Sequence, residues 1–133
     1  FLWMMYRAWW GYKEPGQSRI LAVDISRDGF EWALANSCPS RAETSMSQDE
    51  WEALKQASPV RVQWDPEREL DLQPLPYRAI QIGLSREAVQ RYVHEWICNV
   101  TDVTPLAHEI CRLVQQRRLD EARAALPVER VYR

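Results

Sequence analysis

The sequence is poor in the residues on which several functional motifs depend. It has only four glycines in 133 residues, and no segment has the spacing of a phosphate-binding loop, a dinucleotide-binding turn or a nucleophile elbow. A glycine-rich phosphate cradle is therefore excluded. Its three cysteines include no Cys-x-x-Cys pair, so neither a zinc knuckle nor a disulfide framework is indicated. This cysteine usage favours a reducing, cytoplasmic location.

Histidine is scarce as well. His94 and His108 are the only two, and neither has a second ligand at the i, i+4 spacing that places two metal ligands on one helix face. A metal site is not indicated. We expect both side chains at the surface, with a catalytic role as the minor alternative.

Long apolar runs and a strong net charge are also missing. No run approaches the roughly 20 residues of a membrane helix, so a membrane partner is not expected. The net charge of −2 gives no indication of nucleic-acid binding. Lys13 and Lys55 are the only lysines, and arginine is the cation suited to bidentate phosphate or carboxylate contacts. Arginine-rich codon usage is the preferred explanation of this bias. No cofactor is identified, and the oligomeric state is left open.

What the sequence does have is a dense aromatic beginning. Phe1–Trp10 is an apolar run that predicts a buried helix ending at Gly11. Chain ends are usually polar, so we expect residues 1–133 to be a single domain that lacks an N-terminal segment.

The apolar patterns predict an α+β fold, with a small mixed or antiparallel sheet packed by several helices. Three strands are expected, at Arg19–Ile25 (largely buried), Pro59–Trp64 (ended by Asp65-Pro66) and Tyr77–Leu84. The expected helices are 28–36, one capped by the Ser47–Glu50 capping box, one capped by Ser85, one begun by Thr104-Pro105, and Leu119–Leu126.

Large polar side chains lie beside aromatic residues on the first helix and on two of the strands. Arginine and glutamine in such positions can bind an anion and stack a ring. The candidate ligand-binding residues are Tyr6, Arg7, Arg61, Gln63, Arg78 and Gln81. The alternative is a salt-bridged surface in which Arg61 and Arg78 pair with Asp65 or Glu67. No catalytic residue is identified.

Four segments resemble an uncharacterised family known as domain of unknown function 4291. They are Phe1–Arg7, Val60–Arg68, Arg78–Leu84 and Asp102–His108. In that family a Lys-Pro-Ser lead precedes the first segment, which implies that this chain is an N-terminally truncated member. The chain also has Ala8-Trp9 where members commonly have Ser-Gly. The resemblance implies no mechanism.

Two classes of function follow. One is an enzyme that binds a nucleotide-like ligand, such as an ADP-ribosyltransferase-like enzyme acting on NAD; its weakness is that the later strand offers Gln81 and Gly83 where such enzymes need a glutamate. The other is a non-catalytic binding or interaction module, with an inactive fragment of the family domain as a further possibility.

Overall fold

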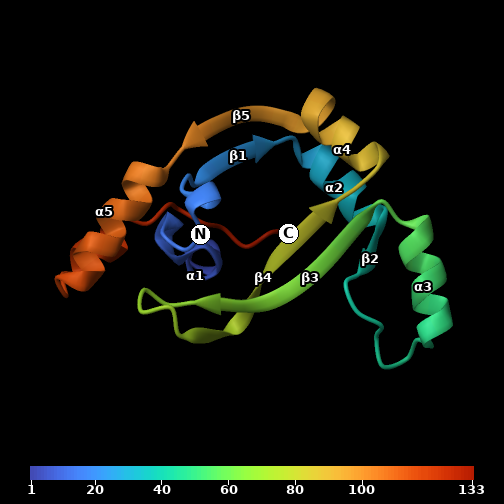
Figure 1. Ribbon diagram of the computed structural model, residues 1–133, viewed down its shortest axis with the longest axis horizontal. Helices are drawn as coiled ribbons and strands as arrows, with labels where there is room; N and C mark the ends of the chain where they lie inside the picture. Colours follow the sequence, from blue (N-terminus) through green and yellow to red (C-terminus); the bar gives the residue numbers. More distant parts are fainter. The chain divides into compact units, whose positions relative to one another are not determined.

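The computed structural model describes residues 1–133 and contains both helices and strands (Figure 1). The helices are α1 (Leu2–Ala8), η1 (Trp9–Gly11), η2 (Pro15–Gln17), α2 (Arg27–Ala35), α3 (Gln48–Ala57), α4 (Glu87–Arg91), η3 (Tyr92–Trp96), α5 (Thr104–Gln115) and α6 (Leu119–Ala125). The strands are β1 (Leu21–Ile25), β2 (Ser37–Pro39), β3 (Val60–Arg68), β4 (Pro74–Leu84) and β5 (Ile97–Asp102). The predicted α+β class is confirmed. None of the helices combines the length and the apolar character that crossing a membrane requires.

The strands form two small sheets where the sequence predicted one. β1 pairs with β5 and runs in the opposite direction, while the other sheet has the order β2-β3-β4 (Figure 1). β2 is parallel to β3, and the β3 and β4 arrows point in opposite directions. β5 was not predicted because most of its side chains are exposed, which leaves no apolar alternation to detect. β1 was expected to be largely buried, but Leu21 is 54% exposed.

The chain folds as two compact units, each with its own core. The first unit comprises Phe1–Ala22, Pro66–Arg78 and Thr101–Arg133, and the second comprises Val23–Asp65 and Ala79–Val100. Buried side chains of the first core come from α1, η1, α5 and α6. Those of the second core come from α2, β3, α4 and η3.

In the first unit, the opening helix is shorter and less buried than predicted. It ends at Ala8 because Trp9 adopts a left-handed backbone conformation (φ 50°, ψ 52°). Met5 and Trp10 enter the core, while the side chains of Tyr6 and Trp9 remain exposed. A helix of 3.6 residues per turn can bury one face only, which is why the continuous apolar run does not become a continuous buried surface.

The C-terminal helices of the first unit agree with the sequence prediction. Ala107, Ile110 and Cys111 are buried along one face of α5. The helix begins at Thr104, whose hydroxyl oxygen accepts a hydrogen bond of 2.8 Å from the backbone N–H of Ile20. This bond joins the start of α5 to the residue that precedes β1.

The second unit contains the parallel pair β2 and β3, connected through α3. The predicted capping box is confirmed, because Ser47 accepts from the Glu50 N–H and the Glu50 carboxylate accepts from the Ser47 N–H. β3 continues beyond Asp65-Pro66, where the sequence analysis ended it. The register pairs β2 with Val60–Val62 only, so Pro66 lies where β3 has one neighbouring strand and its missing N–H is tolerated.

The helix predicted after Ser85 differs in its cap and in its buried face. The Ser85 hydroxyl donates to the carbonyl oxygen of Pro59 instead of capping, and α4 begins at Glu87 after Arg86 at a φ of 50°. The following turn, η3, is a π-helix. Its wider turn changes the angular spacing of the side chains, so Val93 is exposed while Trp96 is buried.

Candidate functional site

The structure divides the six predicted ligand-binding residues between the two units. Tyr6, Arg7 and Arg78 belong to the first unit, whereas the other three belong to the second. Arg7 and Arg78 are exposed.

In the second unit, two of the predicted residues bind the protein itself. The Arg61 guanidinium donates a hydrogen bond of 2.9 Å to the carbonyl oxygen of Ser58, and it does not form the ion pair with Asp65 or Glu67 that the salt-bridged alternative required. The Gln63 amide donates to the carboxylate of Asp65 at 2.9 and 3.2 Å. Each of the two side chains thus has at least one partner within the second unit.

Gln81 is exposed on β4, two residues before Gly83. A side chain at Gly83 would meet only the Cβ atom of Arg61, at the ordinary distance of 3.6 Å. Gly83 therefore marks no unusually close approach of another chain segment, and the space beside it is ordinary strand surface.

In the first unit, Tyr6 belongs to a cleft of about 370 Å³. We call it the Tyr6–Arg68 cleft, and it is lined by Tyr6, Trp9, Lys13, Arg68, Asp71, Leu72 and Gln73. It combines residues of α1 and η1 with the end of β3 and the turn after it. A volume of this size lies within the range of small-molecule sites.

Arg68 and Tyr6 form the floor of this cleft. The guanidinium carbon of Arg68 lies 3.6 Å from the centroid of the Tyr6 ring, which is a close cation–π contact. One guanidinium nitrogen, Nη1, donates to the carbonyl oxygen of Leu72 at 3.2 Å, and Nε is buried without a partner. No carboxylate pairs with the group, so its charge is uncompensated in the structure.

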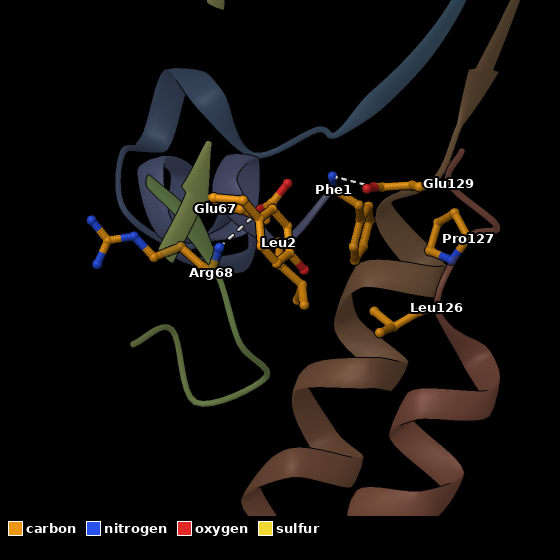
Figure 2. Close-up of a pocket in the computed structure, with 8 residues that line it drawn as sticks. Phe1, Leu2, Glu67, Arg68, Leu126, Pro127 and Glu129 are labelled. Carbon is orange, nitrogen blue, oxygen red and sulfur yellow. Dashed lines mark hydrogen bonds and ion pairs between the residues drawn. The ribbon is translucent and has the colours of Figure 1, made fainter. Parts of the chain in front are cut away.

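The neighbouring Glu67 makes no ion pair with Arg68, and its Oε1 atom is bound by backbone groups. It accepts hydrogen bonds of 3.0 Å from the N–H groups of Trp3 and Arg68. Figure 2 shows the pocket of about 220 Å³ on this side, in which the Arg68 side chain points away from Phe1 and Leu126. The guanidinium of Arg68 therefore lies on the side of the Tyr6–Arg68 cleft.

Trp9 is held in the cleft by a strained backbone. Trp9, Trp10 and Gly11 have consecutive φ values of 50°, 59° and 87°. The left-handed conformation costs about 1–2 kcal/mol for each residue with a side chain. Burial of Trp10 offsets its cost, but Trp9 is 58% exposed. Glycine at position 9 would adopt the same backbone conformation without this cost. Packing therefore does not explain why an exposed tryptophan occupies the position.

The remaining charged groups of the cleft are Lys13 and Asp71. Lys13 is exposed and has no ion-pair partner. Asp71 lies in the turn between β3 and β4, where its carboxylate accepts a hydrogen bond of 3.0 Å from the Gln73 N–H. The cleft thus presents two unpaired cations and one carboxylate around two exposed aromatic rings.

Sequence reasoning recognised Tyr6 but not its partners. Arg68 lies within one of the four family-like segments, and Trp9 lies in the aromatic run, yet neither was selected. No local signal identifies them, because the left-handed turn and the approach of β3 to α1 are tertiary features. His94 is exposed as expected, whereas the expectation of a surface position fails for His108, which is half-buried. Nowhere do three or more His, Cys, Asp or Glu side chains gather to hold a metal ion.

These observations define an α+β protein with a cleft of aromatic rings and unpaired cations. Residues 1–132 match the family described as Domain of unknown function (DUF4291), and the chain belongs to that family. The resemblance of the four segments is confirmed. No curated protein and no solved structure matches the chain.

Proposed function

We propose that the chain binds a nucleotide-like small molecule in the Tyr6–Arg68 cleft. The observation that carries this proposal is Trp9, an exposed tryptophan held in a left-handed backbone conformation next to an uncompensated guanidinium. Strained backbone that contributes nothing to the core concentrates at functional sites. A tryptophan in such a position offers a flat apolar surface for a ring.

Each group of the cleft matches one part of a nucleotide. The Trp9 indole would stack on the base, as aromatic side chains do in many nucleic-acid-binding sites. Arg68 and Lys13 would bind the phosphate, for which the unpaired guanidinium and ammonium are suited. Asp71 retains free acceptor positions on its carboxylate, which match ribose hydroxyls. An anionic ligand is favoured because the two cations outnumber the one carboxylate.

ADP-ribosyl transfer from NAD is a narrower form of the same proposal. It requires a carboxylate at the reacting carbon, and β4 has Gln81 and Gly83 where the later strand of such enzymes would supply it. The proposal therefore concerns ligand binding only. An enzyme and a non-catalytic binding module would both bind the ligand. Consumption of NAD over time separates the two, because only the enzyme turns NAD over.

The test is a thermal melt monitored by tryptophan fluorescence with AMP, ADP and NAD at millimolar concentration. A ligand that binds the native state alone stabilises it by about 2.7 kcal/mol at a hundredfold excess over its dissociation constant. We expect the midpoint to rise with the nucleotides and the rise to disappear in Trp9→Ala and Arg68→Met.

Trp64→Ala is the matched control, because Trp64 is also an exposed tryptophan, at 55%, but lies in the second unit. It should retain the whole ligand response. An unchanged midpoint in the wild-type protein at millimolar nucleotide, or an equal loss of response in Trp64→Ala, would contradict the proposal.

A further inference from the structure

Gln73 is a residue of the Tyr6–Arg68 cleft to which the nucleotide site described above gives no role. That site uses the Trp9 ring, two cations and the Asp71 carboxylate, and Gln73 supplies the only side-chain amide among the lining residues. The side chain is exposed, and the hydrogen bonds that Gln73 makes come from its backbone. The amide therefore has a carbonyl oxygen and an NH₂ group available to a ligand.

The backbone of Gln73 is fixed by its neighbours. Its N–H donates a hydrogen bond of 3.0 Å to the Asp71 carboxylate, and its carbonyl oxygen accepts one of 2.9 Å from the Glu69 N–H. Pro74 follows, and a residue before proline favours an extended conformation. A ligand that bonds to the amide has only the side chain to order, which lowers the entropic cost of binding.

Arg68 joins the peptide bond before Gln73 to the rest of the cleft. Its Nη1 atom donates a hydrogen bond of 3.2 Å to the carbonyl oxygen of Leu72. Leu72 has a left-handed backbone with a φ of 66°, and its side chain packs against the first core. The Leu72–Gln73 peptide bond therefore lies next to the guanidinium that would bind the phosphate.

A side-chain amide presents a hydrogen-bond donor next to an acceptor, which suits adenine. Adenine has a complementary pair on both of its edges, because its N6 amino group lies between the acceptors N1 and N7. Guanine has such a pair on its Watson–Crick edge only, since O6 and N7 on its other edge are both acceptors. Proteins accordingly use glutamine and asparagine to contact adenine through two hydrogen bonds. An amide at the cleft therefore favours adenine over guanine.

We propose that Gln73 sets the base specificity of this site and that the ligand is an adenine nucleotide, a proposal that rests on the nucleotide site described above. The Gln73 carbonyl oxygen accepts a hydrogen bond from the N6 amino group, and the Gln73 NH₂ group donates to the ring nitrogen beside it. Trp9 stacks on the same base. Gln73 thus selects the base, while the cations of the cleft bind the phosphate whatever the base is.

The test compares dissociation constants for AMP, GMP and purine riboside 5′-monophosphate, measured by NMR titration of the full chain. The third compound has the ring system, ribose and phosphate of AMP but lacks the N6 amino group. We expect the wild-type protein to bind AMP about five- to tenfold more tightly than either of the others. This is the lower part of the range for a contact of two hydrogen bonds to a base, because Gln73 is exposed.

Two substitutions at position 73 change the amide in different ways. Gln73→Met retains the length of the side chain without its hydrogen-bonding groups, and should bring the three affinities to within about twofold of one another. Gln73→Glu has acceptors only, which match the adjacent N1–H and N2 amino donors of guanine. It should raise the affinity for GMP relative to AMP, and this ratio is unaffected by the added negative charge because both ligands carry the same phosphate.

Gln90→Met is the matched control, because Gln90 is an exposed glutamine on α4 in the second unit. It should retain the wild-type preference for AMP. Equal affinities for the three ligands in the wild-type protein, or an AMP preference that survives in Gln73→Met, would overturn the role of Gln73 and leave the nucleotide site standing. A preference for GMP would do the same and would point to Arg68, since arginine favours O6 and N7 of guanine. Failure of all three ligands to bind would overturn both proposals.

Discussion

The guanidinium of Arg68 lies over the ring of Tyr6, with 3.6 Å between the guanidinium carbon and the ring centroid. The two residues come from two different segments that resemble the family, one in α1 and one at the end of β3. Their contact joins an aromatic ring to a cation that no carboxylate neutralises. This relationship is the structural basis of the proposed nucleotide site, and it leads to predictions about the residues that surround it.

Replacing Trp9 by glycine should stabilise the protein while removing the ligand response. Glycine adopts the left-handed conformation without the cost of about 1–2 kcal/mol that tryptophan bears, although its unfolded chain is more flexible by about 0.4–1 kcal/mol. We expect the free energy of unfolding to rise by about 0.5–1 kcal/mol, measured by urea denaturation.

Trp9→Ala serves as the matched control for that measurement. Alanine retains a Cβ and therefore most of the backbone strain, so Trp9→Ala should be less stable than Trp9→Gly. Equal stabilities of the two variants would show that the strain at position 9 is absent in solution.

Adding one methyl group at Gly29 should destabilise the second unit. A Cβ atom there would lie 2.4 Å from Cγ of the buried Trp96 ring, which no side chain can accommodate without movement. We expect Gly29→Ala to lower the free energy of unfolding by about 1–3 kcal/mol, the usual range for overpacking. Chemical denaturation followed by tryptophan fluorescence measures this change.

Gly16→Ala is the comparison for Gly29→Ala, since a Cβ atom at Gly16 would have no neighbour within 4 Å. Its stability should stay within about 0.5 kcal/mol of the wild-type value. A similar loss in both variants would mean that the close packing of Gly29 and Trp96 is not the cause.

Acid should weaken the start of α5 through Asp102. The Asp102 carboxylate accepts a hydrogen bond of 2.9 Å from the Thr104 N–H, and hydrogen bonds from the Thr104 side chain and then its backbone N–H hold the pKa of Asp102 below its ordinary value of 3.8. Because the folded-state pKa of Asp102 is lowered, its contribution to stability is present above the unfolded-state pKa and is lost as the pH falls through the folded-state pKa. We expect Asp102→Asn to melt at a lower temperature near neutral pH and to lose less stability than the wild-type protein between about pH 5 and pH 2.

Asp24→Asn provides the control for this pH series. Asp24 is exposed on β1 and its side chain makes no hydrogen bond or ion pair, so Asp24→Asn removes a carboxylate without removing a side-chain contact. If Asp102→Asn and the wild-type protein lost stability in parallel on acidification, the Thr104 hydrogen bonds would not act as described.

The three cysteines should differ in reactivity. Cys98 is exposed, whereas Cys38 and Cys111 are buried, and burial raises the pKa of the Cys111 thiol. Since the thiolate is the reactive form, brief treatment with iodoacetamide should alkylate Cys98 alone. Mass spectrometry should find the other two thiols modified only after denaturation. Equally fast modification of Cys111 in the native protein would contradict its buried position.

Much of the local structure could be predicted because its causes lie within a few residues. The capping box needs only the side chains of Ser47 and Glu50, three positions apart, and it is confirmed. The buried face of α5 follows from apolar residues at helical spacing, and the end of α6 falls one residue from the predicted end. These features depend on hydrogen bonds and side-chain neighbours inside one element, so the sequence pattern is sufficient for them.

The sequence alone therefore determined the α+β class, the starts of α3, α5 and α6, and the family. Only the tertiary structure decided that β1 pairs with β5, that Trp9 remains exposed on a left-handed turn, and that Arg68 meets Tyr6. The physical reason is distance along the chain. Tyr6 and Arg68 are 62 positions apart in the sequence, and no short-range pattern encodes a contact that packing alone creates.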